Sequence, residues 1–277
     1  MSARLDAELV RRGLARSRSH ARAAVKDGRV SVDGRTATKA SAPVSSHADV
    51  RVLVDADDPG YVSRGGYKLA GALDALQPLG LEVVGRRCLD AGSSTGGFTD
   101  VLLRRGAREV VAVDVGSDQL VESLRAEARV VVHEGVSVRG LQPDAVAGPV
   151  DLLVADLSFI SLTTVLPSLA GLIHRKGDLL LMVKPQFEVG RARLGHGGVV
   201  RDPALRAMAV DSVVSTAAGL GLWPVAATVS PLPGPAGNVE FFVWLRPGAP
   251  PAGPPWDDTQ TAALVGGNLP LGAVVRS

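Results

Sequence analysis

Two lysines and two acids in this chain stand at the ends of apolar segments, where an isolated charge is costly to bury. A lysine acts as a base only when its pKa falls from about 10.4 to about 7–8, which takes roughly 4 kcal/mol. A second ammonium group and partial desolvation lower a lysine pKa, whereas a neighbouring acid raises it. We therefore expect the acids to orient the lysines and one lysine to take a proton from a hydroxyl group; two ordinary salt bridges at the end of a sheet are the alternative. The four residues are Lys68, Asp156, Lys184 and Glu240.

A glycine-rich segment, residues 88–100, follows an apolar run and opens a helical pattern. Its spacing, Gly-x-x-x-Gly-Gly, differs from the dinucleotide fingerprint and lacks the Lys-Ser/Thr of a phosphate loop. Asp90, just before the turn, would repel a phosphate but attract a cation, such as the sulfonium and amino groups of S-adenosylmethionine. We therefore expect this loop to bind that cofactor. The expected contacts are Asp90, Gly92, Ser93, Ser94, Gly96 and Gly97.

Two further acids follow the next strand patterns. Asp114 ends the second strand, where a carboxylate can accept two hydrogen bonds from a ribose diol; a surface carboxylate at a strand end is the alternative. Glu134 ends the third strand, where we expect it to hold an adenine edge. A lysine beside this cofactor could take the proton of a sugar hydroxyl as the oxygen attacks the methyl carbon in line. The protein would then mainly position the two reactants.

The elements that must position these residues alternate between strand and helix patterns. Short strands such as 151–155 and 179–183 are almost wholly apolar, as in a sheet that is buried on both faces. The alternation predicts an α/β fold with a doubly wound, mostly parallel sheet and its ligand beyond the strand carboxyl ends. The expected strands are 87–90, 109–114, 130–133, 150–156, 178–184, 225–230 and 238–245, and the expected helices are 68–76, 97–105, 119–126, 162–174 and 203–219.

The first 55 residues differ from the rest in charge. They contain eleven Lys or Arg against six Asp or Glu, whereas the remainder has an acidic excess. Helical patterns at 4–12 and 17–26, followed by alternating residues and an Asp-Gly turn, predict a small α+β domain. A basic module beside a mildly acidic one favours nucleic-acid binding, and a solvated charged face is the alternative. The expected RNA contacts are Arg4, Arg16, Arg18, Arg22 and Lys26, with Arg64 near the mouth of the active site.

These patterns predict four segments: a small basic nucleic-acid-binding domain at 1–55, a linker at 56–63, a methyltransferase domain at 64–246 and a Pro/Gly-rich C-terminal tail at 247–277. The single cysteine, Cys88, excludes an internal disulfide framework and fits a cytoplasmic location. We find no signal-peptide pattern and no apolar run long enough to cross a bilayer, so we expect no membrane partner. The five histidines lack metal-ligand spacing, so we expect no metal. Nothing in the sequence indicates an oligomeric state.

Several motifs resemble the TlyA family, the haemolysin-named ribosomal RNA 2′-O-methyltransferases. They are the segments 4–18, 63–69, 89–100, 155–161, 183–188 and 197–202, and the resemblance covers about residues 4–246. It implies an N-terminal RNA-binding domain like that of a small-subunit ribosomal protein. It also implies a Rossmann-like, FtsJ-like methyltransferase domain that uses S-adenosylmethionine. The Lys-Asp-Lys-Glu tetrad of that broader group would fall on Lys68, Asp156, Lys184 and Glu240.

The resemblance further implies a substrate, the cytidine 2′-hydroxyl of ribosomal RNA, in the large subunit and in some members also the small. Two other functions remain as alternatives. A membrane-lytic haemolysin is suggested by the family's older name, but the chain lacks a spanning segment and a strongly basic amphipathic helix. A non-catalytic RNA-binding factor for ribosome assembly would have the methyltransferase fold without its activity, and the intact tetrad argues against this alternative.

Overall fold

The structure is a computed structural model that describes residues 2–15, 18–26, 28–52, 58–249, 256–266 and 274–277. The chain divides into two compact units, Met1–Arg64 and Gly65–Ser277. We call them the first and second unit and describe each by itself.

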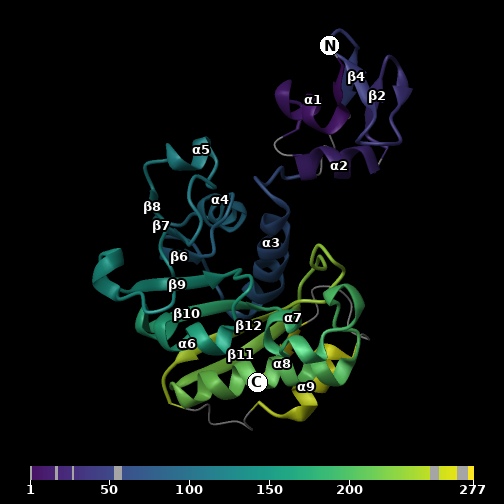
Figure 1. Cartoon of the computed structure of the whole chain (residues 1–277). Coiled ribbons are helices and arrows are strands. Elements are labelled where there is room, and N and C mark those ends of the chain that lie inside the picture. The colour runs from purple at the N-terminus through teal and green to yellow at the C-terminus, as the bar shows by residue number, and fades with distance from the viewer. Residues whose placement is uncertain (1, 16–17, 27, 53–57, 250–255, 267–273) are drawn as a thin grey trace. The chain divides into compact units, whose positions relative to one another are not determined.

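The first unit packs two helices against two small sheets (Figure 1). The expected helices are present as α1 (Leu5–Arg11) and α2 (Arg18–Lys26). The expected hairpin is present as β2 (Val30–Val32) and β3 (Arg35–Thr36), and β5 (Val50–Val52) pairs with β2. Asp33 and Gly34 have φ of 50° and 77° at its turn, as the Asp-Gly pair predicts. The pair β1 (Ser2–Arg4) and β4 (Pro43–Ser45) was not predicted, because three-residue strands show no periodicity.

The second unit is built on an eight-stranded sheet with the order β13-β11-β12-β10-β9-β6-β7-β8. The strands β8, β7, β6, β9 and β10 are mutually parallel, and β12 runs antiparallel between β10 and β11. The predicted mostly parallel α/β sheet is therefore confirmed. The strands are β6 (Arg87–Ala91), β7 (Glu109–Asp114), β8 (Val130–Glu134), β9 (Val150–Ala155), β10 (Ile173–Val183), β11 (Leu222–Val229), β12 (Phe241–Pro247) and β13 (Val274–Arg276).

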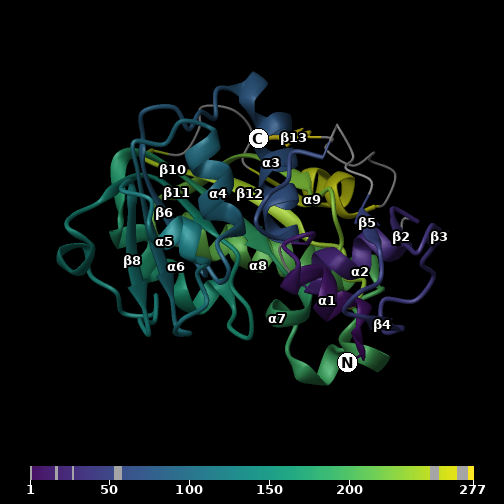
Figure 2. The ribbon, with the colours of Figure 1, turned by 90° about the horizontal axis from the view of Figure 1, so that it is seen from above.

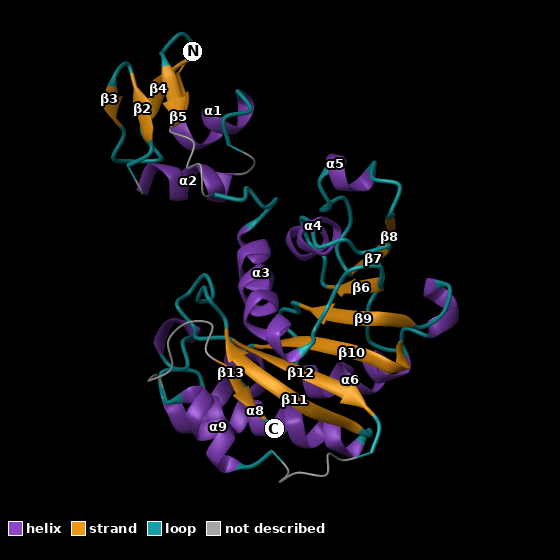
Figure 3. Ribbon diagram, turned by 180° about the vertical axis from the view of Figure 1, so that it is seen from behind, coloured by secondary structure: helices purple, strands orange, loops and turns teal. Residues whose placement is uncertain are grey.

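Helices cover both faces of this sheet (Figures 2 and 3). Leu89 and Ala91 of β6 belong to the core that packs against α6 and α8, whereas Asp90 between them points to α4 and bonds Thr99. Because helices cover both faces of the sheet, the central strands are almost wholly apolar in sequence. The helices are α3 (Arg64–Leu76), α4 (Gly97–Arg104), α5 (Glu122–Arg125), α6 (Leu162–Gly171), α7 (Pro185–Glu188), α8 (Pro203–Gly219) and α9 (Asp258–Val265), with short 3₁₀ turns at Gln77–Leu79, Pro143–Val146, Arg191–Arg193 and His196–Gly198.

The segment after residue 246 differs from the expected Pro/Gly-rich tail at 247–277. Asp257 caps α9 through a capping box, and Leu264 and Val265 of that helix are buried. The strand β13 pairs with β11 and forms the edge of the sheet. These elements are held by tertiary contacts rather than by a long periodic pattern, so the sequence did not reveal them. The second unit therefore runs to the C-terminus.

The order of the strands changes direction at β6 and β9. From β6 the chain proceeds outward through β7 and β8, and from β9 it proceeds the other way through β10. The backbone N–H of Asp156 donates to the carbonyl of Ala91 at 3.0 Å and holds the two strand ends together. The crevice beyond such a switch point is where doubly wound folds bind ligands.

Candidate active site

The four predicted charged residues are assembled as two ion pairs in the second unit. Lys68 Nζ lies 2.5 Å from Glu240 Oε2, and Lys184 Nζ lies 2.6 Å from Asp156 Oδ1. Lys68, Lys184 and Glu240 are buried, and Asp156 is partly exposed. Each buried charge thus has an opposite partner, which burial requires.

Strand register brings the two pairs to one edge of the sheet. Val183 pairs with Phe241 across the antiparallel strands β10 and β12. Lys184 comes directly after Val183 and Glu240 directly before Phe241, so the two residues lie at the same end of this strand pair. The parallel strand β9 ends beside β10, which places Asp156 next to Lys184. The sequence predicted Glu240 inside the last strand, but it lies one residue before β12.

Helix α3 brings Lys68 to this edge. A Cβ on Gly71 would lie 2.7 Å from Pro231 Cγ, so only glycine lets the helix approach the segment after β11 so closely. Lys68 lies one turn earlier on the same face of the helix. The glycine therefore sets the distance from which Lys68 reaches Glu240.

Lys184 has two further neighbours. Its Nζ donates a hydrogen bond to Ser158 Oγ at 2.9 Å and lies 5.8 Å from the ring centroid of Phe187. The Phe187 ring is 5.3 Å from that of Phe159, which is 93% exposed and has φ of 64°. A fully exposed aromatic side chain on a left-handed residue is unusual, and such outliers cluster at functional sites. Phe159 was not predicted as a functional residue, because residue type alone does not show exposure.

A cavity of 440 Å³ lies at the switch point, within the range of ligand sites. A Cβ on Gly92, whose φ is 86°, would lie 2.8 Å from the carbonyl oxygen of Asp156. Glycine is therefore required where the loop crosses the end of β9. Gly96 is the N-cap of α4 and Gly97 its first residue, and the buried Ser93 lies in the turn before them. The lining includes Gly92, Ser94, Asp114, Gln119, Asp156, Leu157, Ser158, Phe159 and Ile160.

Asp114 lines this cavity and also holds the glycine loop. Its Oδ2 accepts the N–H of Ser94 at 2.8 Å, and its Oδ1 accepts the N–H of Gly116 at 2.7 Å. The carboxylate thus lies at the cavity wall, as the position at the end of β7 predicts.

Glu134 is placed differently from the expectation that it holds an adenine edge. Its carboxylate accepts the backbone N–H groups of residues 118–120 and pairs with Arg125 at 2.7 Å. The bond from Leu120 is the largest of the effects that lower the pKa of Glu134 to about 2. The residue therefore supports a loop whose Gln119 lines the cavity, and it is not itself among the lining residues.

Asp90 is fully buried below the glycine loop. Thr99 Oγ1 donates to its Oδ2 at 2.7 Å, while its Oδ1 has no hydrogen-bond partner in the described part of the chain. Burial raises the pKa of Asp90 to about 7; the Thr99 bond opposes this shift and the charge of Asp156 adds to it. Ser93 Oγ is likewise buried without a described partner. Both atoms are suited to a polar ligand at the loop.

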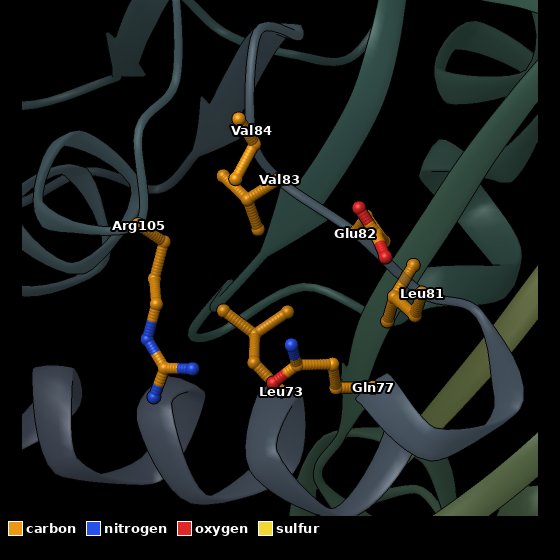
Figure 4. Close-up of a pocket in the computed structure, with 7 residues that line it drawn as sticks. All are labelled: Leu73, Gln77, Leu81, Glu82, Val83, Val84 and Arg105. Carbon is orange, nitrogen blue, oxygen red and sulfur yellow. The ribbon is translucent and has the colours of Figure 1, made fainter.

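A second cavity, between α3 and residues 81–84, measures only 50 Å³ (Figure 4). Leu73, Val83 and Arg105 are among the side chains around it. A water molecule occupies about 30 Å³ of liquid, so this space is too small for a nucleoside. The cavity at the switch point is the candidate cofactor site because of its place beyond the ends of β6, β7 and β9, where doubly wound folds bind ligands.

Three of the predicted RNA-binding arginines converge on one buried acid in the first unit. Asp6 accepts hydrogen bonds from Arg4 at 3.1 and 3.0 Å, from Arg22 at 3.1 Å and from Arg18 at 3.3 Å. These bonds lower the pKa of Asp6, and the bond from Arg4 has the largest effect. The three arginines remain about half exposed, whereas Asp6 is wholly buried. We call these four residues the Asp6 cluster.

The other predicted RNA contacts are scattered. Lys26 is exposed at the end of α2, and Arg64 is exposed as the first residue of α3. Arg16 lies outside the described residues. Within the described residues, no group of three His, Cys, Asp or Glu is arranged to hold a metal ion. The helices that the structure describes include none with the length and apolar character needed to cross a membrane.

Two protein families match the two units. Residues 61–247 match the FtsJ-like methyltransferase family. Residues 3–50 match the S4 domain. The FtsJ-like match covers more than half of the chain.

Individual relatives cover most of the chain. A Mycobacterium tuberculosis protein named 16S/23S rRNA (cytidine-2′-O)-methyltransferase TlyA is 56% identical over 244 residues, or 88% of this chain and 90% of the relative. A Campylobacter jejuni protein named 23S rRNA (cytidine-2′-O)-methyltransferase TlyA is 35% identical over 185 residues, or 66% of this chain and 70% of the relative. The solved structure of a Streptococcus thermophilus protein described as a hemolysin has a TM-score of 0.74 and 34% identity, and it covers 96% of this chain and 94% of that one.

Proposed function

The chain belongs to the TlyA family of ribosomal RNA methyltransferases, and from this premise we propose how its residues carry out the reaction. It is an S-adenosylmethionine-dependent rRNA (cytidine-2′-O)-methyltransferase with an S4 RNA-binding domain. The proposed target lies in large-subunit RNA, and the name of the 56% identical relative favours a second target in the small subunit. The proposed location is the cytoplasm, where its RNA substrate is found. The hemolysin alternative rests on the names of relatives alone.

The residues at the switch point fit S-adenosylmethionine. The unpartnered oxygens of Asp90 and Ser93 are available to a polar ligand, and Asp90 suits a cationic one. The absence of a Cβ at Gly92 and the position of Asp114 at the wall suit the close approach of a nucleoside. S-adenosylmethionine supplies a methyl group whose carbon already carries its leaving group, so no metal and no covalent intermediate is needed.

In the proposed mechanism, the neutral amine of Lys184 would take the proton of the ribose 2′-hydroxyl as that oxygen attacks the methyl carbon and the bond from this carbon to sulfur breaks. Asp156 and Ser158 hold the Lys184 amine at 2.6 and 2.9 Å and so fix its direction. Lys68, held by Glu240, places a second positive charge nearby. The proposal depends on one observation: the buried amine of Lys184 contacts Asp156, which also lines the cofactor cavity.

Mapping of ribose methylation in ribosomal RNA tests this function. RNA from cells with and without the protein would be compared nucleotide by nucleotide. We expect a 2′-O-methylated cytidine that is present only with the protein. Identical maps in the two strains would contradict the proposal.

The binding of S-adenosylmethionine should depend on pH through Asp90. With its pKa raised to about 7, the buried carboxyl of the free chain is neutral in acid. Because a cationic ligand favours the carboxylate, binding should tighten as the pH rises, by at most about tenfold per unit, and level off above pH 7. The same shift means that the contribution of Asp90 to the stability of the free chain falls as the pH rises from about 4 to about 7, because the unfolded state ionises first.

Titration calorimetry from pH 5.5 to 8.5 measures this dependence. Asp90→Asn is the control, because asparagine cannot ionise. This variant should bind S-adenosylmethionine weakly, and the pH dependence of its affinity should come only from the ionisation of the ligand. A wild-type profile that matches that of Asp90→Asn would show that the carboxyl does not take part.

The Asp6 cluster gives a prediction for RNA binding. We propose that Asp6 arranges three arginines to contact RNA phosphates. Asp6→Asn makes the domain more positive, yet it should weaken rRNA binding by roughly tenfold, because the arginines lose their common anchor. Filter binding at several salt concentrations provides the affinity.

Glu8→Gln is the matched control for Asp6→Asn. Glu8 is a buried acid on the same helix, but it holds Arg11 and Arg12 at 2.6–2.7 Å. The two substitutions change the net charge by the same amount, so an effect of charge alone would strengthen RNA binding equally in both variants. Unchanged or tighter binding by Asp6→Asn would refute the role of the cluster.

A further inference from the structure

Gln186 bonds one ion pair of the active site and lies close in the chain to the other. Its Nε2 donates to Glu240 Oε1 at 3.2 Å, while Oε2 of the same carboxylate holds Lys68 at 2.5 Å. Gln186 lies in α7, two residues after Lys184. The amide therefore links the chain segment that carries Lys184 to the pair that carries Lys68.

The orientation of this amide follows from its partner. A carboxylate paired with an ammonium group accepts hydrogen bonds and does not donate them, so the amide nitrogen must face Glu240. The amide oxygen then faces away. Gln186 Oε1 is buried and has no hydrogen-bond partner in the described part of the chain.

An unpaired buried acceptor destabilises the free protein, because it has lost its bonds to water. An apolar side chain of the same length would avoid this cost, but it would also remove the donor to Glu240 Oε1. The bond to Glu240 thus explains the amide nitrogen, whereas the amide oxygen has no structural partner in the described residues and is explained by a role in the reaction.

We propose that Gln186 is a positioning residue for methyl transfer. Through Glu240 it sets the separation of the Lys68 and Lys184 amines, and its Oε1 accepts a hydrogen bond from an N–H or O–H group of the bound acceptor nucleotide. The inference rests on the proposed function, since it assumes that Lys184 acts on a nucleotide hydroxyl. Misplacing a catalytic group by about 1 Å can cost roughly a hundredfold in rate.

The test compares Gln186→Met with the wild type in the full-length chain. We expect kcat for the methylation of ribosomal subunits to fall by about ten- to a hundredfold, with the KM for S-adenosylmethionine unchanged. The melting temperature should change little, because removal of the unpaired acceptor offsets the loss of the donor to Glu240 Oε1. A merely structural role would instead lower kcat and the melting temperature together.

Gln142→Met is the matched control. Gln142 also donates through Nε2, at 3.2 Å to the carbonyl of Gly140, but it is exposed on another loop. This variant should keep the wild-type kcat. An unchanged kcat in Gln186→Met, or a parallel loss of kcat and melting temperature, would overturn the inference. A wild-type chain that transfers no methyl group would instead refute the proposed function, so the two failures are distinguishable.

Discussion

Lys184→Ala is expected to lower kcat for methyl transfer to ribosomal RNA by about 100- to 10,000-fold, the contribution of a positioned general base. The wild-type amine is buried and oriented by Asp156 and Ser158, and alanine leaves no basic group at this position. The KM for S-adenosylmethionine should change little. Steady-state kinetics with labelled cofactor measures both constants.

Two further variants sharpen this result. Lys184→Arg keeps the positive charge, but a guanidinium group does not give up its proton in proteins, so activity should not return. Lys176→Ala is the control, because Lys176 is an exposed lysine on β10, the strand that ends just before Lys184. Wild-type kcat in Lys184→Ala, or full rescue by arginine, would show that Lys184 is not the base.

Glu240→Ala is expected to lower the free energy of unfolding of the second unit by about 3–5 kcal/mol. The loss arises because the Lys68 ammonium, 2.5 Å from Glu240 Oε2, stays buried without its partner. Methyl transfer should be lost as well. The double variant Lys68→Met/Glu240→Ala should recover much of the stability, since no charge is left behind, but none of the activity.

Urea unfolding of the full chain measures these free energies. Asp74→Ala provides the control: the pair of Asp74 with Arg105 at 2.6 Å is largely exposed, so its loss should cost at most about 1 kcal/mol. An equally small loss in Glu240→Ala would mean that the two side chains are hydrated and do not form the buried pair described above.

The strands and their functional ends could be predicted because the pattern is local. Asp156 and Lys184 each follow an apolar run, and parallel strands place such residues at one edge of a sheet. Which acid pairs with which lysine could not be predicted. That pairing depends on the register of β10 and β12 and on the contact between Gly71 and Pro231, residues 160 positions apart in the chain.

Other features depend wholly on tertiary structure. The composition shows that the first 55 residues are basic. It does not show that Arg4, Arg18 and Arg22 all bond the carboxylate of Asp6. The edge strand β13 has three residues, too few for a pattern, and exists because β11 offers an unpaired edge. The position of Glu134 at the end of β8 suggested a ligand contact, whereas three loop N–H groups bond its carboxylate.

The most direct test of the central claim identifies the methylated nucleoside. The full chain and its Lys184→Ala variant would each be incubated with ribosomal subunits and labelled S-adenosylmethionine for a single turnover, and the RNA digested to nucleosides. The proposed chemistry predicts label only in 2′-O-methylcytidine with the wild type, and almost none with the variant. Label on a base, or equal 2′-O-methylation by the variant, would contradict it.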